Sequence, residues 1–297
     1  MDLLVFHRHG RVMRSREAFA WSAFWIALAA AFAALLFFWQ GQQPALQFVT
    51  GYVLELSLSV DNLFLFLVIF RYFSAPERYQ HNVLFWGILG AMLMRGVFIF
   101  AGLNLIHHFH WILYVLGGVL IISGVRFAFA GGHQVDPANN FAVRLLRRRI
   151  PVTENYQNGK FFVRRWKASQ GSDANRGSPL FYATPLLIVL AVIETTDLLF
   201  AVDSIPAVLA VTLNAFIAYT SNVFAILGLR SLYFSVSGLM RNFRFLHTGL
   251  AIVLILIGVK MIAEDYYPVS TLATLAAVAL VIGGAIAASI ALPRNPG

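Results

Sequence analysis

The sequence is dominated by apolar segments that are long enough to cross a lipid bilayer. About 20 apolar residues suffice for one helical crossing, and the chain is 59% hydrophobic and only 12% charged. Soluble domains carry about 25% charged residues, so the composition indicates an integral membrane protein. Spans are predicted at residues 19–38, 46–70, 83–103, 111–130, 181–203, 213–235, 246–263 and 269–291. The expected fold class is all-α, a polytopic membrane protein of about eight transmembrane helices.

The basic residues predict how these spans are oriented. Lys and Arg accumulate in loops that remain in the cytoplasm. Here they precede the first span, follow the last one and occupy every second loop, above all the loop 131–180. The alternate loops 39–45, 104–110 and 264–268 contain neither Lys nor Arg. We therefore expect a multi-pass protein of the inner cell membrane with both termini of this chain in the cytoplasm.

Two of the spans carry carboxylates where lipid is expected. Glu55 and Asp61 lie in the second span, and Glu194, Asp197 and Asp203 lie in the fifth. A charge at the bilayer centre costs about 3 kcal/mol on insertion scales. Spans that keep such a charge usually use it to bind an ion, a proton or a substrate. These five acids are therefore the main indication of function.

Neutral oxygen donors accompany the acids, and together they define the class of ion. Hard oxygen ligands suit Mg, Ca and Mn rather than Cu(I) or Zn, and the chain has no cysteine. The predicted metal ligands are Glu55, Asp61, Asn62, Glu194, Asp197 and Asp203. Supporting roles are predicted for Ser57, Ser59, Thr195, Ser204, Pro206 and Arg95.

Helix geometry limits which of these groups can share an ion. Residues six apart on an ideal helix point about 240° apart. Glu55 and Asp61 therefore serve different sites unless the helix unwinds between them. In the fifth span, Pro206 lacks an N–H and frees the carbonyl of Val202 beside Asp203, which predicts an interruption or kink there. The alternative is a proline beyond the end of the span, where it has no effect.

A competing interpretation is that the buried acids are protonated or paired with basic residues. At most three basic residues, Arg95, Arg230 and Lys260, are available as partners. Arg126 and Lys260 lie at span ends, where the charged group can reach the membrane surface instead. Three cations cannot neutralise five acids, so an ion site is the favoured interpretation.

The two acidic spans also resemble each other. The first pair, Glu55 and Asp61, has the same six-residue spacing as Asp197 and Asp203. Further matches, in the same order, are Asn82-Val83 with Asn222-Val223 and Gly124-Val125-Arg126 with Gly258-Val259-Lys260.

These matches predict two copies of a three-span unit. Repeat one would cover 46–131 and repeat two 183–263, joined by the basic loop 131–180 and flanked by peripheral helices at 19–38 and 269–291. Because three is an odd number, the copies would be inverted relative to each other. Inverted repeats with a site at their midplane interface are a transporter architecture.

The acidic segments resemble a known family. GYVLELSLSVDNLFLF and TPLLIVLAVIETTDLLFAVDSIPAVLAVT are similar to the two signature segments of the TerC family of integral membrane proteins, and SNVFAILGLRSLYF and GLAIVLILIGVKM resemble it too. The resemblance implies kinship with Alx-type proteins linked to manganese export, in a family named for tellurium resistance. It assigns the polar motif positions to Glu55, Asp61, Asn62, Glu194, Asp197, Asp203 and Ser204.

Two departures accompany the resemblance. The family form is expected to have one further span ahead of Met1, which would make nine. Many relatives carry Lys after the first acid of the first motif, whereas this chain has Leu56, so a counter-ion beside Glu55 is missing.

The expected function is export of a divalent cation, Mn²⁺ first and Ca²⁺ second, by secondary alternating access with protons as the candidate coupling ion. The lipid bilayer is the expected partner; no enzymatic activity, organic cofactor or nucleic acid is expected, and HExxH and P-loop motifs are missing from the sequence. The alternative is a membrane scaffold, assembly or envelope-stress factor acting through the loop 131–180.

The topology yields a direct prediction. A reporter inserted after Lys160 should behave as cytoplasmic, and one inserted at His108 should behave as external, because the basic loops stay inside. Measuring both reporters in intact cells checks this, and exchanged results would overturn the span count and the inverted repeats together.

Overall fold

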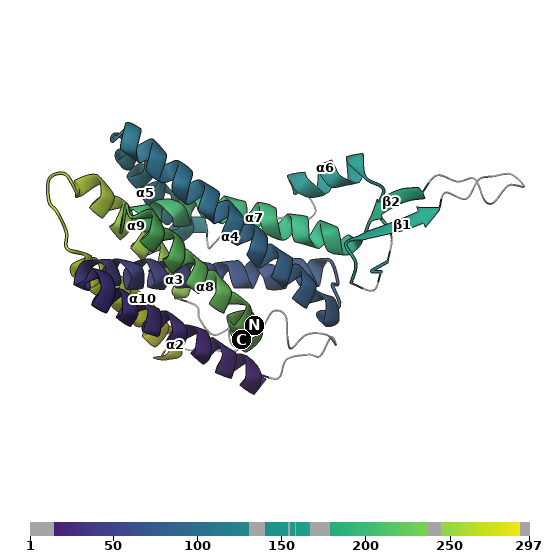
Figure 1. Cartoon of the computed structure of the whole chain (residues 1–297), viewed down its shortest axis with the longest axis horizontal. Helices are drawn as coiled ribbons and strands as arrows, with labels where there is room; N and C mark the ends of the chain where they lie inside the picture. The colour runs from purple at the N-terminus through teal and green to yellow at the C-terminus, as the bar shows by residue number, and fades with distance from the viewer. Residues whose placement is uncertain are drawn as a thin grey trace, which may run out of the picture. The chain divides into compact units, whose positions relative to one another are not determined.

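The computed structural model describes residues 15–130, 140–153, 155–157, 159–166, 179–236 and 245–291. Eight long helices dominate this part of the chain (Figure 1). They are α2 (Ser15–Gln40), α3 (Gln42–Tyr72), α4 (Glu77–His108), α5 (Ile112–Ala130), α7 (Pro185–Leu209), α8 (Ala215–Val236), α9 (Leu246–Ala263) and α10 (Thr271–Ala291). The short helix α6 (Phe141–Arg149) and the strands β1 (Phe162–Trp166) and β2 (Pro179–Ala183) lie between α5 and α7 in sequence.

The long helices coincide with the eight predicted spans. Seven of the described helices are long and apolar enough to cross a membrane, and α8 contributes a shorter apolar stretch, Ala215–Leu229. Large apolar side chains face outward, as Phe38 (85% exposed) and Leu280 (76%) do. The chain is therefore an all-α polytopic membrane protein.

Some predicted boundaries are wrong. The loop expected at 39–45 is a single residue, Gly41, at φ +94°, between the end of α2 and the start of α3. Pro44 lies in the first turn of α3, where its missing N–H costs nothing. The fifth span begins later than predicted, because residues 179–183 form β2, and it continues to Leu209.

The chain divides into two compact units, each with its own packing. The larger lies within residues 13–65, 91–134 and 197–297. In it, α2 packs on α8, and α9 packs on both α5 and α10. One of its apolar clusters includes Leu54, Leu120, Val253 and Ile257.

Small residues let α5 and α9 approach closely. A Cβ on Gly258 would lie 2.7 Å from the carbonyl oxygen of Gly117, and one on Gly124 would lie 2.8 Å from that of Ala251. Such backbone contact is typical of membrane helix interfaces, where packing rather than the hydrophobic effect holds helices together.

The smaller unit lies within residues 66–90 and 135–196. Here the expected simple connector contains α6 and an antiparallel β1–β2 pair with Phe162 opposite Ala183. The Tyr156 hydroxyl donates to the Phe73 carbonyl at 2.7 Å, just after α3 ends. This part of the 131–180 segment is therefore folded and attached to the end of a membrane helix.

Neighbouring glycines on α5 provide a matched test of the close packing. Gly117→Ala should lower stability by about 1–3 kcal/mol, because the new methyl group meets the α9 backbone. Gly118→Ala should be neutral or stabilising by up to about 1 kcal/mol, because no described atom lies within 4 Å of the place its methyl group would take and alanine favours helix. Thermal unfolding in detergent measures both; equal midpoints would contradict the packing.

Candidate functional site

A buried charge cluster is centred on Arg95 of α4, which is only 1% exposed. Its guanidinium forms an ion pair with Glu55 of α3, and its Nη2 lies 3.5 Å from Oδ1 of Asp197 of α7. Its Nη1 also donates to Oδ1 of Asn222 of α8 at 2.9 Å. A charge buried in a membrane protein persists only when it is paired and hydrogen-bonded. Arg95 thus holds the two acids in place and joins four helices.

Further polar side chains surround the pair of acids. The Ser59 hydroxyl donates to Oε1 of Glu55 at 3.0 Å, and the Asn62 amide lies 3.4 Å from Oδ1 of Asp197 as donor. Within the described part of the chain, Glu55 Oε2, Asp197 Oδ2 and Asn62 Oδ1 are buried and accept no hydrogen bond. Buried acceptors without a partner are rare and costly. These atoms could accept a proton, a water molecule or a cation.

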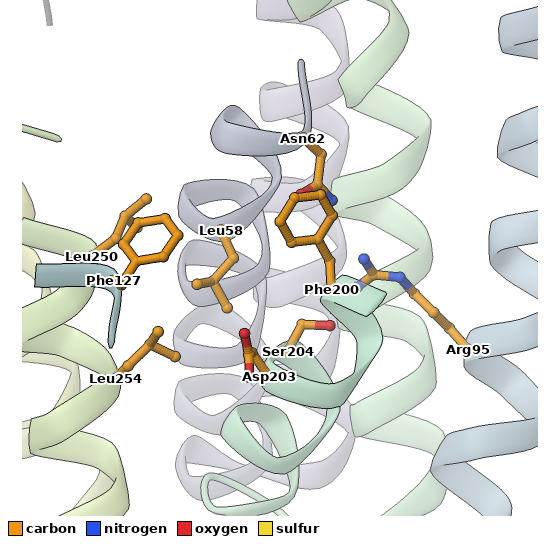
Figure 2. A pocket seen from close by; sticks show the side chains of 9 residues that line it. All are labelled: Leu58, Asn62, Arg95, Phe127, Phe200, Asp203, Ser204, Leu250 and Leu254. Atoms are coloured by element: carbon orange, nitrogen blue, oxygen red, sulfur yellow. The ribbon is translucent and has the colours of Figure 1, made fainter. Parts of the chain in front are cut away.

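A pocket adjoins this cluster (Figure 2). Asp203 and Ser204 come from α7, Leu58 and Asn62 come from α3, and Arg95 reaches toward them from α4. The remaining lining is apolar and consists of Phe127, Phe200, Leu250 and Leu254. The space admits a water molecule or a single ion rather than an organic solute.

Asp203 is the carboxylate of this pocket and is 8% exposed. Its Oδ1 accepts a hydrogen bond from the Ser123 hydroxyl of α5 at 2.5 Å. The neighbouring Ser204 Oγ is buried and has no hydrogen-bond partner among the described residues. The pocket thus combines a carboxylate with neutral oxygens inside an apolar wall.

The structure brings together only part of the predicted ligand set. The side chains that meet in the charge cluster and its pocket are those of Glu55, Ser59, Asn62, Arg95, Asp197, Asp203 and Ser204. Ser57 instead donates to its own helix at the Val53 carbonyl, and Thr195 donates to the Ala191 carbonyl.

Glu194 and Asp61 are the remaining predicted acids. Glu194 belongs to the smaller unit, where it lies beside Gly90: a Cβ on that glycine would come within 2.6 Å of the Glu194 Cδ. Asp61 lies in α3, and its side chain falls outside the described part of the structure. Its predicted ligand role stays a prediction.

The interruption predicted beside Pro206 in the fifth span is wrong, and the unwinding of the second span, which the sequence left open, does not occur. α3 is continuous through Glu55 and Asp61, and α7 is continuous through Pro206 to Leu209. The proline lies in the last turn of α7, and its carbonyl accepts from the Ala210 N–H at 2.9 Å. So close to the helix end, the loss of one backbone donor does not unwind the preceding turns.

The described residues also include no group of three or more His, Cys, Asp or Glu side chains arranged to hold a metal. The arrangement is one carboxylate with neutral oxygens, beside an arginine-bridged pair of acids. Ser123 and Asn222 were not predicted as site residues. Asn222 had a signal, since it is the repeat counterpart of Asn82; Ser123 had only its position before Gly124.

Comparison with known proteins places this arrangement in a family. Residues 40–296 match the integral membrane protein TerC family. The chain belongs to the TerC family. It is 44% identical over 99% of its length to an uncharacterized membrane protein of Myxococcus xanthus, covering 89% of that protein.

The chain is also similar to TerC relatives that have been given a name. Proteins named "membrane-bound redox modulator Alx" from Salmonella typhi and Escherichia coli K12 are 44% and 42% identical, each over 90% of this chain and 82% of the relative. No solved structure is significantly similar to this TerC chain.

The pairing around Arg95 gives a stability prediction. Arg95→Gln should lower the unfolding free energy by about 3–5 kcal/mol, because it leaves Glu55 as a buried charge without its partner. The double variant Glu55→Gln/Arg95→Gln should recover part of that loss. Unfolding of the single and double variants in detergent measures the coupling, and strictly additive losses would show that the pair does not interact.

Proposed function

We propose that this TerC protein is a secondary transporter that exports a divalent cation, with Mn²⁺ as the first candidate and Ca²⁺ as the second. Protons are the proposed counter-ions, and the proposed location is the inner membrane with both termini of this chain in the cytoplasm. Transport rather than catalysis is the proposed role.

The observation that carries this proposal is the pocket between the two acidic motifs. Asn62 of the first motif and Asp203 and Ser204 of the second line the same small space. The Asn62 Oδ1 and Ser204 Oγ accept no hydrogen bond from the described residues. Hard oxygen donors around a water-sized space suit a hard divalent cation. A transported ion must also leave, and one carboxylate with neutral oxygens favours release.

Charge balance supports a divalent cargo. Among the side chains that the structure describes here, ionised Glu55, Asp197 and Asp203 would set three negative charges against the one positive charge of Arg95, which leaves two negative charges. One divalent cation or two protons would neutralise that excess. An exchange of two protons for one cation would therefore keep the low-dielectric interior near neutrality at each step.

The contacts between α5 and α9 support the inverted repeat that alternating access requires. When the repeats are aligned on Gly124 and Gly258, Gly117 aligns with Ala251. The contact between Gly117 and Gly258 then maps onto the contact between Ala251 and Gly124, and both are present. This exchange is what a pseudo-twofold axis between the two helices produces. Rocking of one such repeat against the other is the transport motion of this architecture.

The pocket carboxylate provides the test. Mn²⁺ should raise the thermal unfolding temperature of the purified protein, because a ligand that binds the folded state stabilises it by RT ln(1 + [L]/Kd). Asp203→Asn should lose this shift, and we expect Asp61→Asn to behave similarly. Asp265→Asn is the control, since Asp265 accepts a hydrogen bond from Tyr114 away from the pocket; it should retain the shift.

An Mn²⁺ shift that persists in Asp203→Asn would refute the pocket as the cation site. If cellular function survived Asp203→Asn but were lost on changing exposed residues of α6, the scaffold alternative would replace transport.

A further inference from the structure

The short helix α6 exposes an apolar strip between arginines. Phe141 is 72% exposed and Leu145 is 44% exposed. Because they are four residues apart, they lie on the same face of the helix. Exposed Arg144, Arg148 and Arg149 accompany them. α6 contains no acidic residue.

The adjoining hairpin repeats this composition. Arg164 of β1 is paired with Phe181 of β2, so their side chains lie on one face of the sheet, together with Phe162 two residues away. Phe162 and Phe181 are 51% and 64% exposed. Two neighbouring elements thus each expose aromatic rings beside basic side chains.

Hydrogen bonds and one buried side chain hold this segment in place. Asn140 caps the start of α6 by accepting from the Ala142 N–H at 2.8 Å, and Val143 is buried beneath the helix. Beyond the helix, the Thr153 N–H donates to the Ala183 carbonyl at 2.8 Å, which attaches the residues that follow α6 to β2. The exposed face is therefore preformed.

The segment is also hydrogen-bonded to the end of α3 and to α7. Tyr156 donates to the carbonyl of Phe73, one residue after α3 ends. Asn140 donates to Thr195 of α7 at 3.1 Å, one residue after Glu194. A surface tethered at a helix exit meets the adjacent headgroups at a high effective concentration.

We propose that α6 and the β1–β2 hairpin form an interfacial platform that binds the anionic phospholipid headgroups of the membrane that the chain spans. Phe141 and Leu145 insert at the boundary between headgroups and acyl chains, and Arg144, Arg148 and Arg149 bind the phosphates. Helices with apolar and basic faces lie on bilayers in this way, and their binding depends on anionic lipid.

The bilayer is the occupant that the structure favours over a soluble partner. A soluble acidic partner would need to be recruited, whereas headgroups surround the ends of the spans. Through the Asn140–Thr195 bond, docking would also position the α7 turn that carries Glu194. The proposal is independent of whether the chain transports a cation.

The lack of cysteine in the sequence makes the test direct. The full chain carrying Leu145→Cys is labelled with a nitroxide and reconstituted in nanodiscs of phosphatidylcholine alone or with one-quarter phosphatidylglycerol. Accessibility to oxygen and to a water-soluble nickel complex reports immersion. Asn155→Cys, at an exposed position in the following loop, is the matched control.

In phosphatidylglycerol discs, the label at residue 145 should be accessible to oxygen and shielded from nickel, while that at residue 155 stays accessible to nickel. Adding Arg148→Gln and Arg149→Gln should reduce the docked-to-undocked ratio by about tenfold or more, given the usual contribution of each basic residue near an anionic surface. Equal nickel accessibility at both positions would overturn the proposal, as would immersion that does not depend on phosphatidylglycerol.

Discussion

The ion pair between Arg95 and Glu55 is the constraint on which the site depends. Neither side chain reaches water, since Arg95 is 1% exposed and Glu55 is fully buried. Bringing either into the membrane alone would cost several kcal/mol. Because Arg95 also lies close to Asp197 and donates to Asn222, the need to pair one cation fixes α3, α4, α7 and α8 relative to one another at this level.

The same pairing determines what remains for a ligand. Arg95 bridges Glu55 and Asp197, the two acids that occupy equivalent positions in the motif alignment, so neither is fully available to a cation. Asp203 accepts a hydrogen bond from Ser123 and lies next to Ser204, whose hydroxyl has no hydrogen-bond partner among the residues that the structure describes. On this account the arginine is a permanent counter-ion, and the charge left over by the acids is what a transported cation or protons would neutralise.

The sequence predicted the membrane helices well because crossing a bilayer requires long apolar runs, which a single sequence displays directly. The prediction of a loop at Gln42–Ala45 was wrong, because polar residues there suggested a loop although Pro44 suits a first helical turn. The search for apolar runs did not find α6, because this helix is too short and too basic to resemble a span. Asn140 is nevertheless a favourable helix cap.

The site was predictable in its residue types but not in its pairing. Acids and hydroxyls inside spans indicate a polar site. That Arg95 pairs with both Glu55 and Asp197 depends on tertiary distances, which the sequence does not show. The interruption predicted at Pro206 was wrong because the effect of a proline depends on its distance from the helix end. Here α7 ends only three residues later, at Leu209.

Ion flux tests the central claim most directly. The purified chain in proteoliposomes should transport Mn²⁺ down an imposed gradient at a saturable rate, should move protons in the opposite direction, and should lose both fluxes in Asp203→Asn while Asp265→Asn retains them. Mn²⁺ flux no greater than in protein-free liposomes, together with no flux of Ca²⁺ or other divalent cations, would contradict the account.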